Sequence, residues 1–328
     1  MRCAIGLDLG GSSAKVALVA DTGEVLVADH VAIPETMNAA DVLNPIASAV
    51  DRLRYDAAKR AVSPIAVGCG FSGYLDNTRT TIEQNNTPAL DGFALAPWLY
   101  ERFGLPVALD NDACVAALAE TRLAHMPDKH RVLFVTVGSG IGVVLVVDGV
   151  VVRVMKGVTN DASHIIVNFG SQHRCPVGCS GCLETVASAR AIARAGIRAA
   201  QDGSSSPLKH VLAETGEITG LDVSYAASSG DAAAREILAR AGQWLGVGLA
   251  SWACTYAPDI VLLGGAVAEA GEAWLQGAID TMRGIGMPLF VDRLDVATAT
   301  LGNRAGVIGA ALMALQEADR RVERESSL

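Results

Sequence analysis

A short pattern that occurs twice constrains the fold of this chain more than any other feature. An apolar segment over 4–9 runs into Gly10-Gly11, and a second apolar segment follows at 15–20. The same order returns over 132–147, with glycines at 138, 140 and 142. Short apolar runs bounded by turn residues are typical of buried strands. The repeat favours two α/β lobes of common design, and two unrelated β-hairpins are the alternative that so short a repeat leaves open.

The rest of the chain alternates strand patterns with helical patterns. The charged C-terminal residues 318–328 follow the last helical pattern, and we expect them to be frayed. A mixed order of strands and helices is typical of α/β architecture. Helices are expected over 39–61, 91–103, 113–125, 187–200, 232–256 and 305–317, and further short strands over 24–28, 65–69, 107–109, 150–154 and 260–263.

Composition excludes several classes of protein. The chain has 328 residues, of which 51% are hydrophobic and 19% charged, so it is long enough for two domains with substantial cores. Its net charge of −9 and the lack of a Lys/Arg cluster argue against nucleic acid as a partner. No apolar stretch approaches the roughly 18 residues of a membrane span, and the N-terminus lacks a signal-peptide pattern. We expect a cytoplasmic protein without a membrane partner.

Three glycine turns follow buried strands and are candidates for phosphate binding. A turn without Cβ atoms lets backbone N–H groups approach a phosphate, although each turn alone is equally typical of a simple hairpin. None fits the P-loop pattern, and strands rather than helices follow the first two, which excludes the dinucleotide-binding fingerprint. Asp8 interrupts its strand just before the first turn, where a carboxylate could orient Mg²⁺-bound water or cap the turn. The candidate ATP-binding residues are Asp8, Gly10, Gly11, Ser12, Lys15, Thr136, Gly138, Ser139, Gly140, Gly264 and Gly265.

Four motifs, taken in order, resemble those of the ROK family of bacterial sugar kinases and sugar-responsive repressors. They are Asp-Leu-Gly-Gly-Ser over 8–12, Asn-Asp-Ala over 111–113, Gly-Ser-Gly-Ile-Gly over 138–142 and Cys-Ser-Gly-Cys-Leu-Glu over 179–184. The resemblance covers residues 3–315. It implies a two-lobed actin/hexokinase-like (ribonuclease H-like) α/β fold with an interlobe cleft, and a homodimer or homotetramer. The implied small lobe is 1–113, with the closing helix 305–317 packing back on it, and the implied large lobe is 114–304, with a zinc loop.

Asn111 and Asp112 are the candidate catalytic pair. Between a strand and a helix, Asp112 could be only a helix cap. The resemblance implies that Asp112 is the general base and that Asn111 holds sugar hydroxyls. A positioned carboxylate can accept the proton of a sugar hydroxyl as it attacks the γ-phosphate of ATP. The implied activity is that of an ATP-dependent, glucokinase-like hexose kinase acting on the 6-hydroxyl.

Further sugar contacts are implied by the resemblance, with departures. His164 and Glu184 match the family's residues directly. Asp161 stands where the family has Glu, and because Asp is one methylene shorter, its contact with the sugar must shift or pass through water. Asn86 matches a family asparagine only loosely, and a turn asparagine is an equal alternative.

Three of the seven cysteines fall within eight residues, which favours a metal site over disulfides in a cytosolic chain. Together with His164, the residues Cys175, Cys179 and Cys182 could form a tetrahedral zinc site. The family spacing is altered here, so the loop must take another path, and three free thiols are the alternative. We expect a structural Zn²⁺ that holds His164 and Glu184 in place.

The particular sugar does not follow from the sequence. Fructose, mannose, allose, N-acetylmannosamine and amino sugars are alternatives to glucose. The family also contains repressors with an added N-terminal DNA-binding domain, and because the first strand pattern starts at Ala4, we expect no such domain here. A non-catalytic sugar sensor is a further alternative, which the presence of Asp8, Asp112 and the glycine turns disfavours.

Overall fold

The structure is a computed structural model that describes residues 1–124, 128–155, 158–159, 161–269 and 271–326. It divides into two compact units. Unit 1 consists of Met1–Pro127, Val146–Asn160 and Asn303–Leu328, and unit 2 of Asp128–Leu145 and Asp161–Gly302. Two expectations fall partly outside the described residues, namely the end of a helix at His125 and the state of residues 327–328. Within the described residues, no helix is long and apolar enough to cross a bilayer.

Unit 1 is built on a five-stranded sheet of order β3-β2-β1-β4-β7. The first three strands pair antiparallel, whereas β1, β4 and β7 run parallel. The carboxyl ends of the three parallel strands therefore lie at one edge, the usual location of a ligand site in such sheets. The strands are β1 (Cys3–Leu9), β2 (Ser13–Ala20), β3 (Val25–Ala32), β4 (Val67–Phe71) and β7 (Val107–Asn111).

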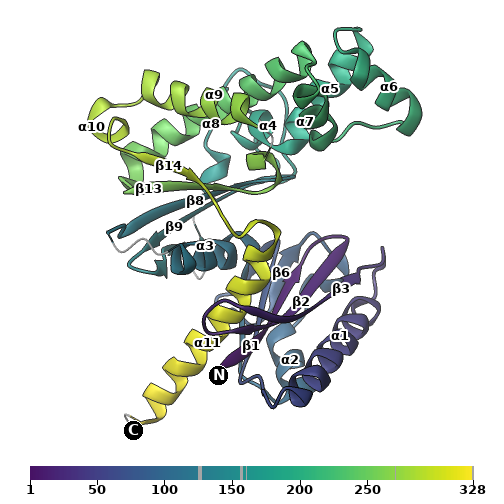
Figure 1. Cartoon of the computed structure of the whole chain (residues 1–328), viewed down its shortest axis with the longest axis vertical. Coiled ribbons are helices and arrows are strands. Elements are labelled where there is room, and N and C mark those ends of the chain that lie inside the picture. Colours follow the sequence, from purple (N-terminus) through teal and green to yellow (C-terminus); the bar gives the residue numbers. More distant parts are fainter. Residues whose placement is uncertain (125–127, 156–157, 160, 270, 327–328) are drawn as a thin grey trace. The chain divides into compact units, whose positions relative to one another are not determined.

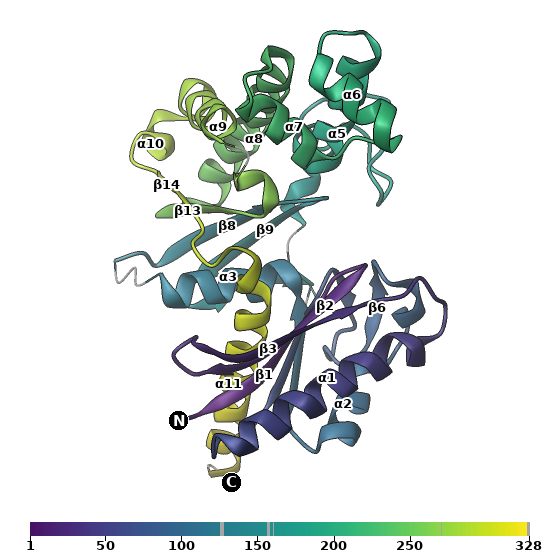
Figure 2. The same ribbon diagram turned by 45° about the vertical axis from the view of Figure 1, so that its right-hand side comes forward.

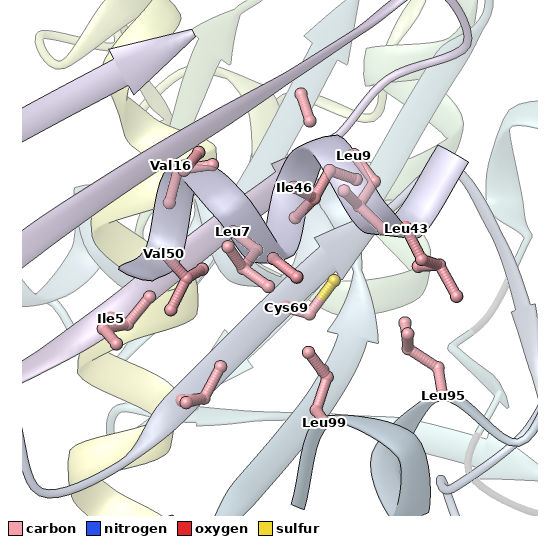
Figure 3. Packing of buried hydrophobic residues seen from close by; sticks show 14 of the residues in the cluster. Ile5, Leu7, Leu9, Val16, Leu43, Ile46, Val50, Cys69, Leu95 and Leu99 are labelled. Atoms are coloured by element: carbon pink, nitrogen blue, oxygen red, sulfur yellow. The ribbon is translucent and has the colours of Figure 1, made fainter. Parts of the chain in front are cut away.

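One face of this sheet carries the main hydrophobic core of unit 1. Alternate residues of β1, among them Ile5 and Leu7, are buried against helix α1 (Ala39–Lys59) and helix α2 (Leu95–Phe103) (Figure 3). Strand side chains alternate between faces, so the residues between these must point to the other side.

The other face of the sheet is covered by the last helix, α11 (Ala305–Ser326), which packs on β1, β4 and on α3 (Asp112–Leu123) (Figures 1 and 2). Two strand glycines allow the close approach. A Cβ at Gly6 would lie 2.0 Å from the Val307 carbonyl oxygen, and one at Gly68 would lie 1.8 Å from that of Ala310. The C-terminal helix thus completes the N-terminal sheet.

Unit 2 contributes most of a second sheet, of order β10-β9-β8-β13-β14. The three strands β8, β9 and β10 take the places that β1, β2 and β3 have in the first sheet, and β13 and β14 take those of β4 and β7. The internal repeat therefore includes the strand order of the sheets as well as the short sequence motifs. β13 runs parallel to both β8 and β14. The strands are β8 (Arg131–Val137), β9 (Ile141–Val147), β10 (Val150–Val151), β13 (Ile260–Gly264) and β14 (Asp295–Thr298).

Helices form the rest of unit 2. Helices α8 (Ala232–Tyr256) and α9 (Glu272–Ile285) pack side by side (Figure 2). Gly242 of α8 makes this possible, because a Cβ there would lie 2.1 Å from the Trp274 carbonyl oxygen. The remaining helices of unit 2 are α4 (Glu184–Ala187), α5 (Ala189–Gln201), α6 (Ser206–Thr215), α7 (Gly220–Ser228) and α10 (Pro288–Val291).

Three helix predictions differ from the structure. The helix expected over 187–200 begins only at Ala189, because Ser188 is extended and separates it from the short helix α4. The helix expected over 91–103 begins only at Leu95, after the separate 3₁₀ turn Pro88–Leu90. The C-terminal segment, expected to fray, continues α11 to Ser326. An ion pair between Arg2 and Asp319 ties this extension to the start of β1.

Candidate functional site

The polar residues of unit 1 gather where β1, β4 and β7 end. In the strand register, Asp8 of β1 lies opposite Gly70 of β4, and Phe71 of β4 lies opposite Asn111 of β7. Asp112 follows as the first residue of α3. The sheet therefore brings the predicted residues Asp8, Asn111 and Asp112 to one edge of unit 1.

Asp112 and Asn111 share the start of α3. Asn111 is the helix cap, and its Oδ1 accepts the Ala113 amide at 2.9 Å, while Asp112 Oδ1 accepts the same amide at 2.8 Å. The Asn111 amide group donates to the Gly73 carbonyl at 3.2 Å. Asp112 accepts this amide through Oδ1 only, so its carboxylate keeps lone pairs for another proton donor.

The environment of Asp112 suits a general base. Burial raises the pKa of Asp112 to about 6; the Ala113 amide opposes this shift and the negative charge of Asp8 adds to it. A base works best when its pKa lies close to the working pH, because it is then ionised yet still accepts a proton. At neutral pH this carboxylate is charged and more basic than an ordinary aspartate.

Ser72 is a site residue that sequence reasoning missed. It follows β4 at the same sheet edge, and its hydroxyl bonds the Asp112 carboxylate. The Asn86 amide also donates to Ser72 Oγ, at 2.9 Å. Ser72 thus joins the candidate base to the loosely matched Asn86. The available signal was the turn sequence Gly-Phe-Ser-Gly over 70–73, directly after a buried strand.

The first glycine turn lies beside Asp8 and Asn86. Lys15 Nζ donates to Asp8 Oδ2 at 3.2 Å, so the predicted acid and lysine form an ion pair across the hairpin. A Cβ added to Gly11 would come within 3.6 Å of Asn86, and Gly11 and Ser12 are exposed. Gly306, at the start of α11, would clash with the Asp8 carboxylate at 2.7 Å if it had a Cβ, which makes it a second missed neighbour.

In unit 2, the other two glycine turns lie next to each other. Thr136 of β8 lies opposite Gly264 of β13. Gly265 has a φ of +84°, and a Cβ there would approach Thr136 Oγ1 to 2.7 Å. Backbone amides and a hydroxyl at the ends of two parallel strands are groups that can bind phosphate oxygens.

Glu184 contacts the second glycine turn. Its Oε2 accepts the Ile141 amide at 3.0 Å, and the space for a Cβ at Gly140 is taken by the same oxygen, 2.6 Å away. Gly140 therefore has to be glycine as long as the carboxylate lies there. A predicted sugar residue and a predicted phosphate turn are in this way parts of one contact within unit 2.

The predicted metal ligands converge. The ligand atoms of His164, Cys175, Cys179 and Cys182 all lie within 4.8 Å of one another. Cys179 Sγ is 3.1 Å from Cys175 Sγ and 3.3 Å from His164 Nδ1. Zn–S bonds of about 2.3 Å in a tetrahedron put sulfurs about 3.8 Å apart, so the cluster has the size of a zinc site.

A tight turn accounts for the altered cysteine spacing. The Gly178 amide donates to the Cys175 carbonyl at 2.9 Å, and Gly178 has a φ of +99°. The chain then folds back, so that the Cys175 amide donates to the Cys179 carbonyl. Burial and the neighbouring Cys175 thiol raise the pKa of Cys179 to about 12. Three thiols packed so closely are hard to ionise together, and a divalent cation would offset that cost.

Asp161 lies on the far side of the His164 ring. His164 Nδ1 faces the thiols, whereas Nε2 is 3.6 Å from Asp161 Oδ1. Ser163 Oγ donates to the same Asp161 oxygen at 3.0 Å. A carboxylate opposite a metal-binding imidazole commonly fixes the ring orientation. Asp161 itself is exposed and can also contact a ligand.

Comparisons with known proteins identify the family of the chain. A sequence profile of the ROK family matches residues 4–317. A glucokinase of Halalkalibacterium halodurans is 30% identical over 316 residues, which cover 96% of each chain. A crystal structure of a ROK family glucokinase from Streptomyces griseus, in complex with glucose and AMPPNP, superposes with a TM-score of 0.82. It is 30% identical, and the match covers 96% of this chain and 99% of that one.

Regulators share the same fold. The crystal structure of a ROK family transcriptional regulator, a homologue of an Escherichia coli protein, superposes with a TM-score of 0.83 at 26% identity. That match covers 95% of this chain and 77% of the regulator. The profile match along nearly the whole chain, together with relatives aligned from end to end, confirms the resemblance and the two-lobed α/β fold that it implied: this chain is a member of the ROK family.

Proposed function

We propose that this protein is an ATP-dependent hexose kinase of the glucokinase type, which phosphorylates the 6-hydroxyl of its sugar. The observation that carries the proposal is Asp112, a carboxylate with a pKa raised to about 6, directly after the carboxyl end of β7. A sensor that only binds sugar needs no such base. The glucokinase relatives, similar along their whole length, support the same function.

The chemistry assigned to unit 1 is proton transfer and positioning. Asn111 and Asn86 hold sugar hydroxyls, and Asp112 accepts the proton of the attacking hydroxyl. That oxygen forms a bond to the γ-phosphorus as the bond between this phosphorus and the bridging oxygen of ADP breaks. The products are a sugar phosphate and ADP, and the proton stays on Asp112 until solvent removes it.

Asp8, Lys15 and the glycine turns are assigned to the phosphates of ATP. The exposed Gly11 and Ser12, and the paired strand ends at Thr136 and Gly264, present amide and hydroxyl groups suited to phosphate oxygens. Mg²⁺ carried with ATP would neutralise phosphate charge, and Asp8 is the carboxylate that we assign to its water ligands. Ser139, Gly138, Gly140 and Gly265 complete the set.

His164, Cys175, Cys179 and Cys182 are assigned to one structural Zn²⁺. Their ligand atoms fit the size of a tetrahedral site, and the second histidine nitrogen faces Asp161 rather than the thiols. All four positions are filled by protein, so the ion would supply rigidity and no nucleophile. It would hold Asp161, His164 and Glu184 for contacts with sugar hydroxyls.

The proposal also covers assembly and location. We infer a homodimer or homotetramer in the cytoplasm, where ATP is made and thiols remain reduced. Ile285, Met287 and Leu289 at the α9–α10 turn are 53–73% exposed, and clustered exposed apolar side chains favour self-association. Light scattering on the purified protein measures the mass directly, and a monomer at micromolar concentration would contradict this inference.

A panel of sugars assayed for ADP release tests the function. It should include glucose, fructose, mannose, allose, N-acetylmannosamine and an amino sugar, with Asp112→Asn as the matched inactive control. We expect turnover with glucose or a related hexose, and turnover lower by about 10²–10⁴-fold in the control. The similarity to regulators supports a non-catalytic sugar sensor as the second candidate. Sugar binding by calorimetry without ADP release from any sugar would favour that sensor.

A further inference from the structure

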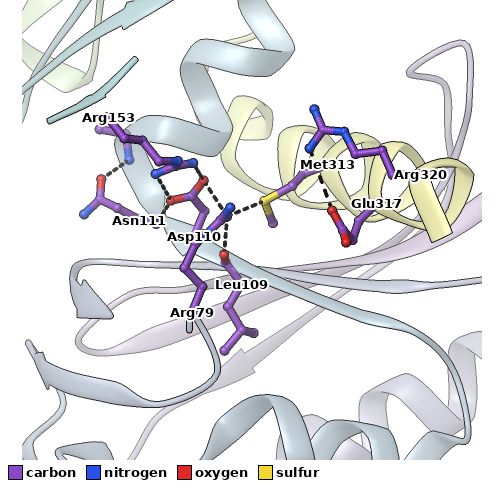
Figure 4. Close-up of polar contacts among 9 residues, drawn as sticks. Arg79, Leu109, Asp110, Asn111, Arg153, Met313, Glu317 and Arg320 are labelled. Atoms are coloured by element: carbon purple, nitrogen blue, oxygen red, sulfur yellow. Dashed lines mark hydrogen bonds and ion pairs between the residues drawn. The ribbon is translucent and has the colours of Figure 1, made fainter. Parts of the chain in front are cut away.

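An ion cluster around a buried carboxylate lies directly before the proposed catalytic pair on β7, and its two arginine side chains are half-buried. Asp110 is only 4% exposed and immediately precedes Asn111. Its carboxylate accepts Arg79 Nη2 at 2.9 Å and Arg153 Nη1 at 3.2 Å, and it bonds a second nitrogen of Arg153 (Figure 4). Two cations thus meet one anion inside unit 1. None of these three residues was singled out from the sequence.

The same carboxylate also binds the backbone of the catalytic pair. Asp110 Oδ1 accepts the Asn111 amide at 2.9 Å. The two carboxylate oxygens are therefore shared among an adjacent amide and two guanidinium groups. Arg153 bonds both oxygens, which fixes the plane of the carboxylate as well as its position.

Arg79 links β7 to the hairpin of β5 (Gly73–Leu75) and β6 (Ile82–Asn85). Its backbone has a φ of +57°, and the loop is held by Asp76, whose Oδ1 accepts the Thr80 amide at 2.7 Å. Arg79 Nη2 donates to the Leu109 carbonyl at 2.6 Å as well as to Asp110. A non-glycine residue in this left-handed conformation persists only where the surroundings enforce it.

The hairpin is tied to both sides of the strand end. Arg79 holds Asp110 on one face of β7, and Asn111 holds the Gly73 carbonyl on the other. Ser72 lies just before this hairpin and Asn86 just after it. The register of the hairpin on β7 thus sets where Ser72 and Asn86 stand relative to Asp112.

Arg153 comes from a different part of the chain. It begins strand β11 (Arg153–Met155), within the excursion Val146–Asn160 that returns to unit 1. Burial acts to lower the pKa of Arg153, but the Asp110 carboxylate outweighs it and holds this pKa above its usual value. The guanidinium is therefore charged, and its contact pins the excursion to β7.

Stability alone does not account for such a cluster. Transferring a charged group from water to the protein interior costs several kcal/mol, and the attraction between opposite charges offsets about the same amount. Apolar residues of similar volume at such positions therefore often make a protein equally stable or more stable. Three apolar side chains would not fix the orientation of the strand end, because van der Waals contacts have no preferred angle. The paired N–H groups of a guanidinium bond a carboxylate only in a defined geometry.

We propose that Asp110, Arg79 and Arg153 are positioning residues that orient Asn111 and Asp112 for phosphoryl transfer. This inference rests on the proposed kinase function. Displacing a reacting group by about 1 Å can cost roughly 100-fold in rate, so small shifts of the strand end are enough to matter. The cluster bonds the strand end that carries the proposed sugar-binding pair, so we expect the KM for sugar, and not the KM for ATP, to depend on it.

Steady-state kinetics of Arg79→Lys, Arg153→Lys and Asp110→Asn test the proposal. Lysine keeps the charge but cannot form the fork. We expect kcat to fall roughly 10- to 100-fold in each variant, with a raised KM for sugar and an unchanged KM for ATP. Asp110→Glu, which restores the charge, should recover part of the rate lost in Asp110→Asn. Arg52→Lys is the matched control, since Arg52 forms a similar two-nitrogen contact with Asp29 elsewhere in unit 1.

Thermal unfolding of each variant separates positioning from a merely structural role. Rates are measured well below the unfolding midpoint and expressed per folded molecule. If the lysine variants lower the midpoint but keep kcat, the cluster is structural and the inference is wrong, whereas the kinase function stands. If wild-type protein phosphorylates no sugar of the panel, the proposed function fails and the inference falls with it. Should Asp110→Asn not fold, the two lysine variants still decide.

Discussion

Asp112 carries two opposing consequences at the scale of a single residue. The burial that makes it a stronger base also makes its charge unfavourable in the folded protein, because the same group ionises more easily when the chain is unfolded. Its folded pKa is raised, from 3.8 to about 6, so below pH 4 the residue is protonated in both states. Between pH 3.8 and about pH 6, Asp112 stays protonated in the folded state but is ionised in the unfolded state. The free energy of unfolding therefore falls as pH rises through this range.

Asp112→Asn should therefore lower activity and raise stability. Loss of a general base typically costs about 10²–10⁴-fold in kcat, whereas sugar binding should survive because Asn keeps an oxygen that accepts the Ala113 amide. At pH 8 the variant should unfold at a higher temperature than wild type, and near pH 4 the two should converge. Calorimetry of both proteins at pH 8 and near pH 4 measures the unfolding temperatures, and steady-state kinetics at pH 8 measures kcat. Near-wild-type turnover by a folded variant would falsify the assigned role.

The pH profile of the wild-type enzyme reports the same group. A base that must be ionised predicts that kcat/KM falls as pH drops below about 6, approaching one tenfold loss per pH unit. Asp112→Glu, which keeps a carboxylate, should retain such a limb if it retains turnover. A wild-type profile flat down to pH 5 would contradict the raised pKa.

Asp161 tests how the sugar is recognised. If its exposed carboxylate contacts hydroxyls, Asp161→Ala should raise KM for sugar far more than KM for ATP. Asp161→Glu should change the ranking among hexoses, by about 1–3 kcal/mol for each displaced contact. Ser163→Ala removes a neighbour that bonds the same carboxylate and serves as a control for local structure. An unchanged ranking in both Asp161 variants would remove this residue from the sugar site.

At the scale of elements, contact between a helix and a sheet depends on missing side chains. Gly6 and Gly68 let α11 lie directly on the sheet of unit 1, with helix carbonyls where Cβ atoms would otherwise be. A backbone carbonyl cannot rotate away as a side chain can, so a Cβ in this space would force the whole helix to shift.

Gly68→Ala should destabilise unit 1. Its Cβ would lie 1.8 Å from the Ala310 carbonyl oxygen, so α11 must retreat from β4, at a cost on the order of 1–3 kcal/mol or more. Gly284→Ala in α9 is the control, because its Cβ meets nothing within 4 Å and alanine favours helix. Chemical denaturation of both variants provides the comparison, and equal stability of the two would contradict the close packing.

The cysteine loop should depend on metal. We expect about one zinc per chain, lost in Cys182→Ser and retained in Cys254→Ser, whose exposed thiol lies outside the cluster. Sugar binding should weaken in the first variant only, since Glu184 follows Cys182 by two residues. Metal analysis of protein prepared without chelator measures this, and its finding no zinc would leave the loop as three free thiols.

What the sequence could predict follows from how local each signal is. The strand–glycine–strand repeat and the Asn-Asp pair are each formed by residues that are neighbours in the sequence. The structure has strands at both copies of the repeat and the start of helix α3 at the Asn-Asp pair. Ser72 and Gly306 were missed because their relation to Asp112 and Asp8 exists only once distant segments are packed together. The Asp110 cluster joins residues 31 and 43 positions apart, a partnership that no local pattern encodes. Helices α6 and α7 were missed because they are only 10 and 9 residues long and bury few apolar side chains. Helix α9 was missed although it has 14 residues, because Gly277 and Gly284 lower the helix propensity of its sequence.

At the scale of the whole molecule, the two sheets share one strand order but have been specialised differently. Unit 1 has the proposed base and its ion cluster at the strand ends, whereas unit 2 has paired glycine turns, Glu184 and the proposed metal ligands. The strand ends of the first sheet thus carry ionisable side chains, whereas those of the second sheet carry exposed turns rich in glycine. This division is consistent with a duplicated framework whose strand ends acquired separate chemistry.

The return of α11 to the first sheet also bears on how the chain is made. The ribosome releases β1 and β4 about 240–300 residues before the helix that covers them, so the glycine-lined face of their sheet stays bare throughout most of translation. Unit 2 lies almost wholly within the intervening stretch and can finish folding first. If unit 2 folds before α11 is synthesised, the nascent chain passes through a state in which unit 2 is complete while the sheet of unit 1 still lacks the 22-residue helix α11, and this exposed sheet would be a binding site for chaperones.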